Sequence, residues 1–228
     1  MVKRRPSSSR WLHEHHNDPF VLKARREGYR SRAAYKLLEI ADHPLSGTGG
    51  RLLKPGMTVV DLGSAPGGWS QVAADLVGDS GRVVAMDVLS MPPLDGVVFI
   101  QGDFLGVDGF TNLNEAIQPR KRVDVVLSDM APNMTGIETV DQTRGELLAE
   151  TAHEFARQVL GPGGTMVVKL FQGPGFHQTV RRARADFTRV KVIKPLASRD
   201  RSAEHYLVGV GFRGLPNMPA TASDDGGP

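Results

Sequence analysis

The sequence predicts a doubly wound α/β domain, in which helices cover both faces of a mostly parallel seven-stranded sheet. Short Val-rich segments that are apolar at successive positions recur along the chain, as strands buried on both faces require. Segments with helical periodicity alternate with them, and a glycine-rich turn separates the first expected strand from its helix. We expect the last strand to run antiparallel to the others.

Two short helices are expected ahead of the sheet. The first begins after Asp18, whose carboxylate suits an N-cap, and ends at Gly28. The second covers residues 32–41, and we expect Ser31 to cap it. Its apolar stripe leaves Lys36 on the opposite face, so periodicity alone predicts that this lysine is solvated.

After a Gly- and Pro-rich linker over residues 44–56, strands and helices alternate. The expected strands cover residues 57–62, 82–88, 97–101, 123–128, 164–171, 188–194 and 205–212. The expected helices cover residues 69–77, 110–117, 141–160 and 176–186.

The composition excludes several kinds of site and location. With 228 residues, 40% of them hydrophobic, the chain suits one globular domain. We expect a monomer, because no apolar segment remains that would need burial against a second copy of the chain. The absence of cysteine excludes disulfides and Cys-ligated metals, and the seven His show no ligand spacing, so no metal is expected. No apolar run reaches the ~20 residues of a membrane helix. We therefore expect a cytoplasmic protein, with the mitochondrial matrix as the less favoured alternative because the first ten residues are basic and Ser-rich.

Charge is distributed unevenly along the chain. Residues 1–39 carry ten Lys and Arg against four Asp and Glu, and residues 181–201 carry eight against two. Residues 40–180 between them are acidic, with nine basic and sixteen acidic side chains. This arrangement indicates a polyanionic partner, and the alternative interpretation is ordinary solvated surface charge.

A nucleoside site is expected at the ends of the first three strands. The first strand ends in Asp61 and continues into a turn that contains Gly67 and Trp69. Asp87 ends the second strand, where a carboxylate commonly accepts hydrogen bonds from ribose, and Asp103 follows the third. The turn has no Lys or Arg to receive a pyrophosphate, so S-adenosylmethionine fits better than NAD or ATP. The alternative is that these aspartates only cap helices and shape loops.

Candidate catalytic groups follow the later strands. Asp129 comes just after the fourth strand, and Lys169 lies inside an apolar strand, where a lysine is costly unless its ammonium is paired. Glu204 precedes the last strand, and an antiparallel orientation would bring it to the same edge of the sheet. Lys169 is a plausible base for a ribose hydroxyl, and the alternative is a lysine that only reaches a surface ion pair.

Five segments resemble the motifs of the FtsJ/RrmJ family of RNA 2′-O-ribose methyltransferases, namely residues 28–37, 61–69, 128–133, 168–173 and 194–206. The resemblance implies a Rossmann-like class I methyltransferase fold with S-adenosylmethionine as cofactor. It places the catalytic Lys–Asp–Lys–Glu set of the family on Lys36, Asp129, Lys169 and Glu204. It places the cofactor contacts on Gly67, Trp69, Asp87, Asp103 and Asp129.

Composition predicts the two tails of the chain, and the resemblance implies the division between them and a substrate. We expect a disordered basic tail over residues 1–16, a helical RNA-binding extension over 17–50, a methyltransferase domain over 51–213 and a disordered tail over 214–228. The expected reaction methylates the ribose 2′-hydroxyl of a uridine in large-subunit ribosomal RNA, during late assembly of the large ribosomal subunit. The alternatives are 2′-O-methylation of tRNA and a non-catalytic RNA-binding assembly factor. A nicotinamide dehydrogenase would share the fold, but the Pro-containing turn and the basic C-terminal loop argue against it.

Overall fold

A computed structural model describes residues 18–44, 52–118, 122–199 and 202–214 of the chain. The two expected disordered tails lie outside these ranges, apart from Gly214. The helices are α2 (Pro19–Glu27), α3 (Ala33–Ala41), α4 (Gly68–Val77), α5 (Gly109–Ile117), α6 (Glu138–Val159) and α7 (Phe176–Asp186). The strands are β1 (Thr58–Leu62), β2 (Arg82–Asp87), β3 (Val97–Gln101), β4 (Val123–Ser128), β5 (Leu160–Phe171), β6 (Phe187–Ile193) and β7 (Glu204–Phe212).

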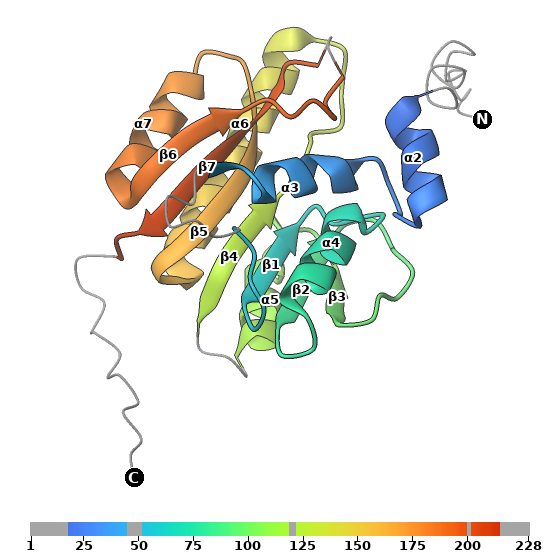
Figure 1. The fold of residues 1–228 in the computed structure, drawn as a ribbon. Coiled ribbons are helices and arrows are strands. Elements are labelled where there is room, and N and C mark those ends of the chain that lie inside the picture. Colours follow the sequence, from blue (N-terminus) through green and yellow to red (C-terminus); the bar gives the residue numbers. More distant parts are fainter. Residues whose placement is uncertain (1–17, 45–51, 119–121, 200–201, 215–228) are drawn as a thin grey trace.

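The seven strands form one sheet in the order β3-β2-β1-β4-β5-β7-β6 (Figure 1). β1 pairs in parallel with β2 and β4, and the parallel pairing continues to β3 on one side and β5 on the other. β7 runs antiparallel to both of its neighbours, β5 and β6. The predicted mostly parallel sheet with an antiparallel last strand is therefore confirmed.

Helices cover both faces of the sheet because the parallel strands are apolar on both. Val60, Leu62 and Val84 point to the face that α5, α6 and α7 cover. Their neighbours Val59 and Val83 point to the opposite face, which α3 and α4 cover (Figure 1). Alternate residues of one strand thus enter two separate cores, which explains why the strands read as continuous apolar runs.

The N-terminal helices agree with the expectation at their ends, except for one cap. The Asp18 carboxylate accepts hydrogen bonds from the Phe20 and Val21 amides, and Gly28 ends α2 with a left-handed φ of 78°. The prediction that Ser31 caps α3 is wrong, because Arg32 is the N-cap residue and no side-chain hydrogen bond caps the helix. The Ser31 hydroxyl is instead buried near Gly68, at the first turn of α4.

One strand is longer than expected. β5 begins at Leu160, directly after α6 ends at Val159, whereas the sequence pattern predicted a helix to residue 160 and a strand from 164. The early start comes from a pairing between Leu160 and Val123, followed by a register shift between Val123 and Val125.

Within the described ranges, no helix combines the length and the apolar character needed to cross a membrane.

Candidate active site

The topology brings the predicted catalytic residues to one edge of the sheet. β1, β4 and β5 all end at this edge, and Asp129 follows the last residue of β4. Because β7 is antiparallel, it begins at the same edge, where Glu204 pairs with Phe171 at the end of β5. The same register sets Lys169 of β5 beside Tyr206 of β7. Asp129 and Glu204, which are 75 positions apart in the sequence, therefore lie at the same edge of the sheet because β7 is antiparallel.

The four predicted catalytic side chains form a continuous chain of contacts through Tyr206. The Lys169 ammonium lies 2.6 Å from Asp129 Oδ1 and donates a hydrogen bond of 2.9 Å to the Asp129 carbonyl oxygen. The Tyr206 hydroxyl donates to Asp129 Oδ1 at 2.6 Å and accepts from Lys36 Nζ at 3.2 Å. Lys36 in turn pairs with Glu204 at 2.6 Å. These contacts join two lysine–carboxylate ion pairs through one hydroxyl group, and each of the four charged side chains lies 2.6 Å from a group of opposite charge.

The prediction from periodicity that Lys36 is solvated is wrong. Lys36 has a relative exposure of 9% and lies in α3, which contacts both the core beneath it and the start of β7. Ala34, Leu37 and Ile40 pack against the core beneath α3, while Lys36 faces the start of β7. Helical periodicity identified only the apolar contact surface, because a lysine that is paired at a second surface has no apolar signature.

Electrostatics favour an ionised Asp129 beside a protonated Tyr206. Burial by itself would raise the pKa of Asp129, but the Lys169 and Lys36 ammonium groups outweigh it and lower that pKa below its usual value. Burial, followed by the charges of Asp129 and Glu204, raises the pKa of Tyr206 well above its usual value. The hydroxyl of Tyr206 therefore remains a donor that holds the Asp129 carboxylate in place.

Tyr206 had no assigned role in the sequence interpretation, although it closes the last recognised motif. It is fully buried and its ring packs against Trp69, with 5.4 Å between the ring centroids. The signal that could have revealed it is its place in the register, because a buried tyrosine opposite Lys169 needs a polar partner for its hydroxyl.

A second buried carboxylate lies beneath the site. Asp61 of β1 is fully buried, and its Oδ2 accepts a hydrogen bond of 2.6 Å from the Ser70 hydroxyl. Burial raises the pKa of Asp61 to about 7, and the nearby Asp129 and Asp87 carboxylates add to the increase, while the Ser70 hydrogen bond opposes it. In the folded chain Asp61 therefore holds its proton at a pH where the unfolded chain has lost it.

This raised pKa predicts a pH-dependent stability difference between the wild-type chain and Asp61→Asn. Since the unfolded carboxyl ionises near pH 4, ionisation of the unfolded chain lowers the free energy of unfolding as pH rises from about 4 to 7. Asp61→Asn lacks this loss, so its stability relative to wild type should increase over that range by up to a few kcal/mol and level off above pH 7. Denaturant unfolding of both chains at pH 5, 7 and 8.5 measures the difference. Parallel curves for the two chains would contradict the raised pKa.

The predicted cofactor residues Asp87, Asp103 and Asp129 line one cavity of about 410 Å³. The cavity lies at the ends of the first four strands of the sheet, where ligands of open α/β sheets bind. The full set of described lining residues is Gly63, Ala65, Met86, Asp87, Val88, Leu89, Gly102, Asp103, Phe104, Leu105, Asp129, Met130, Ala131, Asn133 and Leu148. The set contains no Lys or Arg, which disfavours a pyrophosphate.

The glycine-rich turn lets two loops approach each other at this cavity. A Cβ on Gly63 would lie 2.8–2.9 Å from atoms of Met130, and Gly63 has a φ of 76° that other residues rarely adopt. Asp87 Oδ2 accepts a hydrogen bond of 2.8 Å from the Ala65 amide and so ties the turn to the end of β2. The cavity is therefore shaped by backbone proximity that only glycine permits.

Gly67 and Trp69 are not among the residues that line this cavity. Gly67 is the N-cap residue of α4, and a Cβ at this position would lie 3.0 Å from side-chain atoms of Arg30 and Leu94. The Trp69 ring is buried, and its indole N–H donates to the Ala33 carbonyl oxygen at 2.8 Å. The Trp69 side chain thus fastens α4 to α3, which carries Lys36.

Among the described residues, no group of three His, Asp or Glu could hold a metal ion.

Comparison with known proteins identifies relatives of the whole described chain. A family model described as FtsJ-like methyltransferase matches residues 29–212. The chain is 57% identical over 215 residues to a ribosomal RNA large subunit methyltransferase E from Magnetococcus marinus, covering 94% of this chain and all of that protein. It is 53% identical over 213 residues to the protein of that name from Pseudomonas aeruginosa, covering 93% and 100%. A crystal structure of a ribosomal RNA methyltransferase from Plasmodium falciparum is similar with a TM-score of 0.67 and 30% identity, covering 82% of this chain and all of that one.

Proposed function

Because the chain belongs to the FtsJ-like methyltransferase family, we propose that it methylates the ribose 2′-hydroxyl of a uridine in large-subunit ribosomal RNA, with S-adenosylmethionine as donor. The observation that carries this proposal is the buried Lys169–Asp129 pair at a cavity whose lining includes Asp129. A base and an acidic group at the mouth of a nucleoside-sized cavity suit the deprotonation of a hydroxyl next to a bound cofactor. We propose a monomer that acts in the cytoplasm.

The lining of the cavity suits the proposed cofactor in its charge and its hydrogen-bonding groups. S-adenosylmethionine would supply a methyl group that its sulfonium already activates. Asp87 and Asp103 offer carboxylate oxygens to the hydroxyl and amino groups of a nucleoside, and Asp129 places a negative charge where a cation would bind. The chain's remaining tasks are to align the ribose hydroxyl and to accept its proton.

Lys169 is the residue we assign to the 2′-hydroxyl, either as its main orienting group while it is an ammonium or, once that proton has been released to solvent, as the neutral amine that accepts the hydroxyl proton. Its ammonium is held by both the carboxylate and the carbonyl oxygen of Asp129, so its position is set before RNA binds. Alignment of two reacting groups by such fixed partners contributes several kcal/mol to lowering a barrier. Asp129 then acts as the anchor of Lys169 and as the acidic side of the cofactor site.

Lys36 and Glu204 are assigned to positioning, because they reach Asp129 only through Tyr206. We expect Lys36→Ala and Glu204→Ala each to lower kcat/KM by roughly ten- to a hundredfold, less than the loss of Lys169. Since the two side chains form one pair, the double variant should lose little more than either single variant. Methyl transfer by the three variants measures this, and fully additive losses would contradict a shared role.

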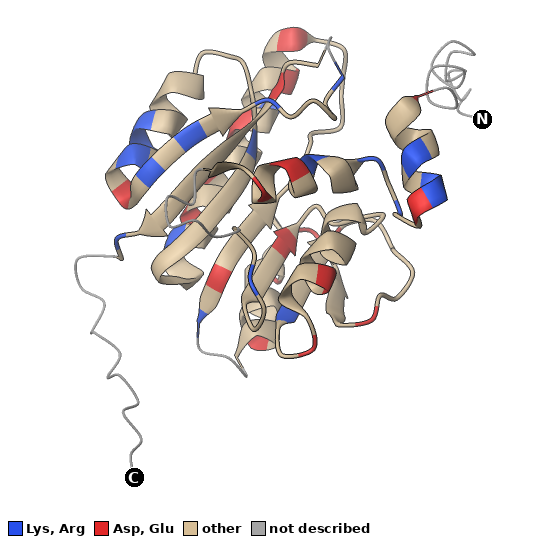
Figure 2. Cartoon of the chain, in the orientation of Figure 1, with Lys and Arg blue, Asp and Glu red and all other residues tan. Residues whose placement is uncertain are grey.

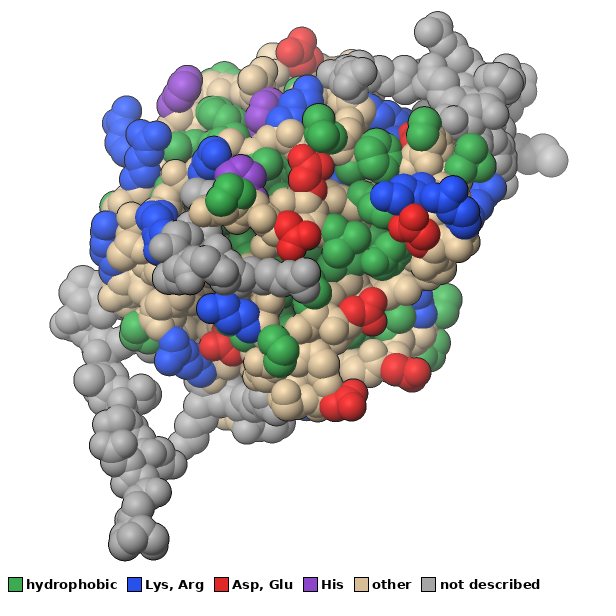
Figure 3. Space-filling view, viewed as in Figure 1, with side chains coloured by type: hydrophobic (Ala, Val, Ile, Leu, Met, Phe, Trp, Pro, Cys, Tyr) green, Lys and Arg blue, Asp and Glu red, His purple; other side chains and the backbone are tan. Residues whose placement is uncertain are grey.

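Basic side chains suit the RNA partner, although their distribution alone does not identify it. Figure 2 shows Lys and Arg on α2 at one side and on α7 and β6 at the other. In the space-filling view of Figure 3 these side chains lie toward the two sides of the face, with hydrophobic and acidic side chains between them. The Arg32 guanidinium bonds both Asp18 and the Ala197 carbonyl oxygen, and so joins the N-terminal helices to the loop before β7. We propose that residues 17–50 form the RNA-binding extension of the methyltransferase domain.

The test of the proposed function is transfer of labelled methyl from S-adenosylmethionine, followed by mapping of the modified nucleotide. The acceptors are undermethylated large ribosomal subunits, free ribosomal RNA and tRNA. Label on a single 2′-oxygen of large-subunit RNA would support the proposal. Label on tRNA would keep the chemistry and change the substrate. Measurable cofactor binding without label on any RNA would favour a non-catalytic assembly factor.

A further inference from the structure

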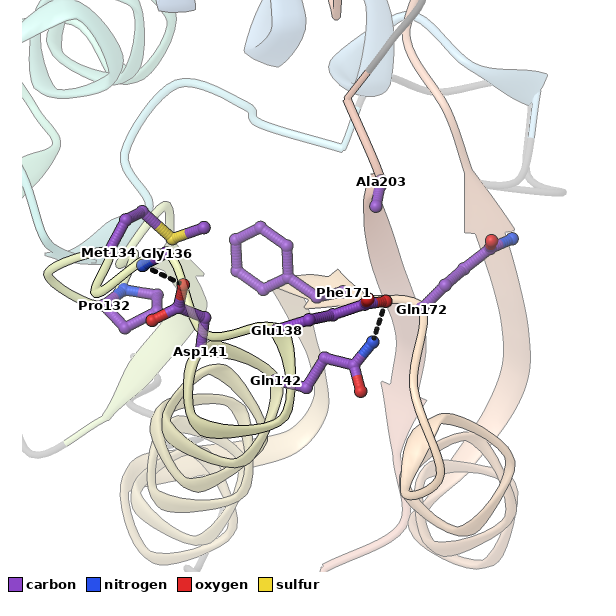
Figure 4. A pocket seen from close by; sticks show the side chains of 9 residues that line it. All are labelled: Pro132, Met134, Gly136, Glu138, Asp141, Gln142, Phe171, Gln172 and Ala203. Atoms are coloured by element: carbon purple, nitrogen blue, oxygen red, sulfur yellow. Dashed lines mark hydrogen bonds between the residues drawn. The ribbon is translucent and has the colours of Figure 1, made fainter.

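A second cavity, of about 300 Å³, lies beside the catalytic residues and has no role in the reaction described so far (Figure 4). Four segments form it: the start of α6 contributes one wall, and each of the other three adjoins a predicted catalytic residue. Pro132 and Met134 belong to the loop that follows Asp129, Phe171 is two positions beyond Lys169, and Ala203 precedes Glu204. The described lining residues are Pro132, Met134, Gly136, Glu138, Asp141, Gln142, Phe171, Gln172 and Ala203.

One loop separates this cavity from the cofactor cavity. Ala131 and Asn133 line the cofactor cavity, whereas Pro132 and Met134 line the second one. Successive residues of the loop therefore serve opposite sides of a common wall. An acceptor must approach the transferred methyl from the side away from the donor sulfur, and the second cavity, across this wall from the cofactor cavity, offers space for a part of the acceptor.

The chemistry of the lining suits a planar, uncharged heterocycle. The Phe171 ring points into the space between Met134 and Ala203, and Pro132 adds a flat apolar surface (Figure 4). Among the described lining residues there is no Lys or Arg, and the Glu138 and Asp141 carboxylates would repel a phosphate. The Gln142 side-chain amide donates to Glu138 Oε1 at 3.1 Å, and its carbonyl oxygen can accept a hydrogen bond from a base edge, whereas the Gln172 amide points away from the Phe171 ring (Figure 4).

The cavity is built rather than incidental. Asp141 accepts hydrogen bonds from the Thr135 amide at 2.7 Å and the Gly136 amide at 3.0 Å, which hold the loop against α6. Gly145 of α6 makes room for the Phe171 ring, because a Cβ there would lie 2.7 Å from the ring. Met134 nevertheless remains 70% exposed at the rim, an apolar side chain that an occupant would cover.

We propose that this cavity binds the nucleobase of the acceptor nucleotide, stacked on Phe171, while its ribose lies at Lys169. This inference rests on the proposed function. It predicts that Phe171 and Met134 determine recognition of the acceptor RNA without contributing to cofactor binding.

The first test compares steady-state methyl transfer by wild type, Phe171→Ala and Met134→Ala, with Leu147→Ala as a control. Leu147 is 52% exposed on α6, the helix that contributes Gln142 to the second cavity, and it lines neither cavity. Loss of one stacking contact should raise the KM for RNA roughly tenfold in Phe171→Ala, with a smaller rise in Met134→Ala. The Kd of both cavity variants for S-adenosylmethionine should equal that of wild type. Leu147→Ala should have the same KM for RNA as wild type. Unchanged RNA kinetics in both cavity variants would overturn the proposal.

A second measurement does not depend on turnover. Large-subunit RNA that contains 4-thiouridine is photo-crosslinked to the full-length wild-type chain, and the crosslinked peptides are sequenced by mass spectrometry. Crosslinks at Phe171 or Met134 support the base site, and crosslinks found only elsewhere overturn it. If wild type transfers no methyl group, the proposed function fails, but crosslinking still decides whether the cavity binds a base.

Discussion

Replacement of Lys169 by alanine is expected to lower kcat by roughly a thousandfold, within the range of about 10²–10⁴ typical of a positioned base. Its ammonium lies 2.6 Å from Asp129 Oδ1, and its relative exposure is only 7%. Water cannot replace such a group at the same position. Single-turnover methyl transfer with saturating RNA and cofactor measures the effect directly.

Two further variants show whether the loss belongs to the chemistry. Lys169→Arg keeps a cation but cannot give up its proton, so recovery of activity by this variant would identify orientation rather than proton transfer as the main role. Lys54→Ala removes an exposed lysine that precedes β1, at the opposite edge of the sheet, and should behave as wild type. If Lys169→Ala retains wild-type kcat with unchanged cofactor affinity, the assignment of Lys169 is wrong.

Replacement of Asp129 by alanine is expected to have two large effects. It removes the partner of the buried Lys169 and of the Tyr206 hydroxyl, so we expect a loss of about 3 kcal/mol in the free energy of unfolding. It also removes the negative charge from the cofactor cavity and the anchor of Lys169, so methyl transfer should fall below that of Lys169→Ala. Denaturant unfolding measures the first effect, and cofactor titration together with methyl transfer measures the second.

The pH dependence of the Asp129 contribution has a definite sign. Because neighbouring cations lower the pKa of Asp129 in the folded chain, its stabilisation is present above the unfolded value of about 4 and is lost as pH falls through the folded value. The destabilisation of Asp129→Ala relative to wild type should therefore shrink at low pH. A constant difference at every pH would contradict the ionised pair.

The order of the elements could be predicted because it depends on local patterns. Seven of the eleven residues of β1 and β4 are Val or Leu, and these strands are indeed buried on both faces. The predicted position of Asp129 and Glu204 at one sheet edge followed from strand ends and one antiparallel strand, which the structure confirms. The catalytic roles of these residues stay predictions until the variants are measured.

Contacts between distant segments decided what local patterns could not. Lys36 looked solvated because its partner Glu204 lies 168 positions away, and only the packing of α3 across the sheet brings them to 2.6 Å. Tyr206 became a bridge between Lys36 and Asp129 for the same reason. Ser31 does not cap α3 as expected, because the approach of α4 buries its hydroxyl near Gly68.

By itself, the sequence determined the fold class, the edge of the sheet that carries the site, and the residue types available there. Strand and helix periodicity act over a few neighbouring residues, so they are visible in one chain without any tertiary information. The tertiary structure alone decided which charges are paired and where the two cavities share a wall. These features depend on packing between segments, and the free energy of burying a charge or a ring is set by neighbours that no local pattern specifies.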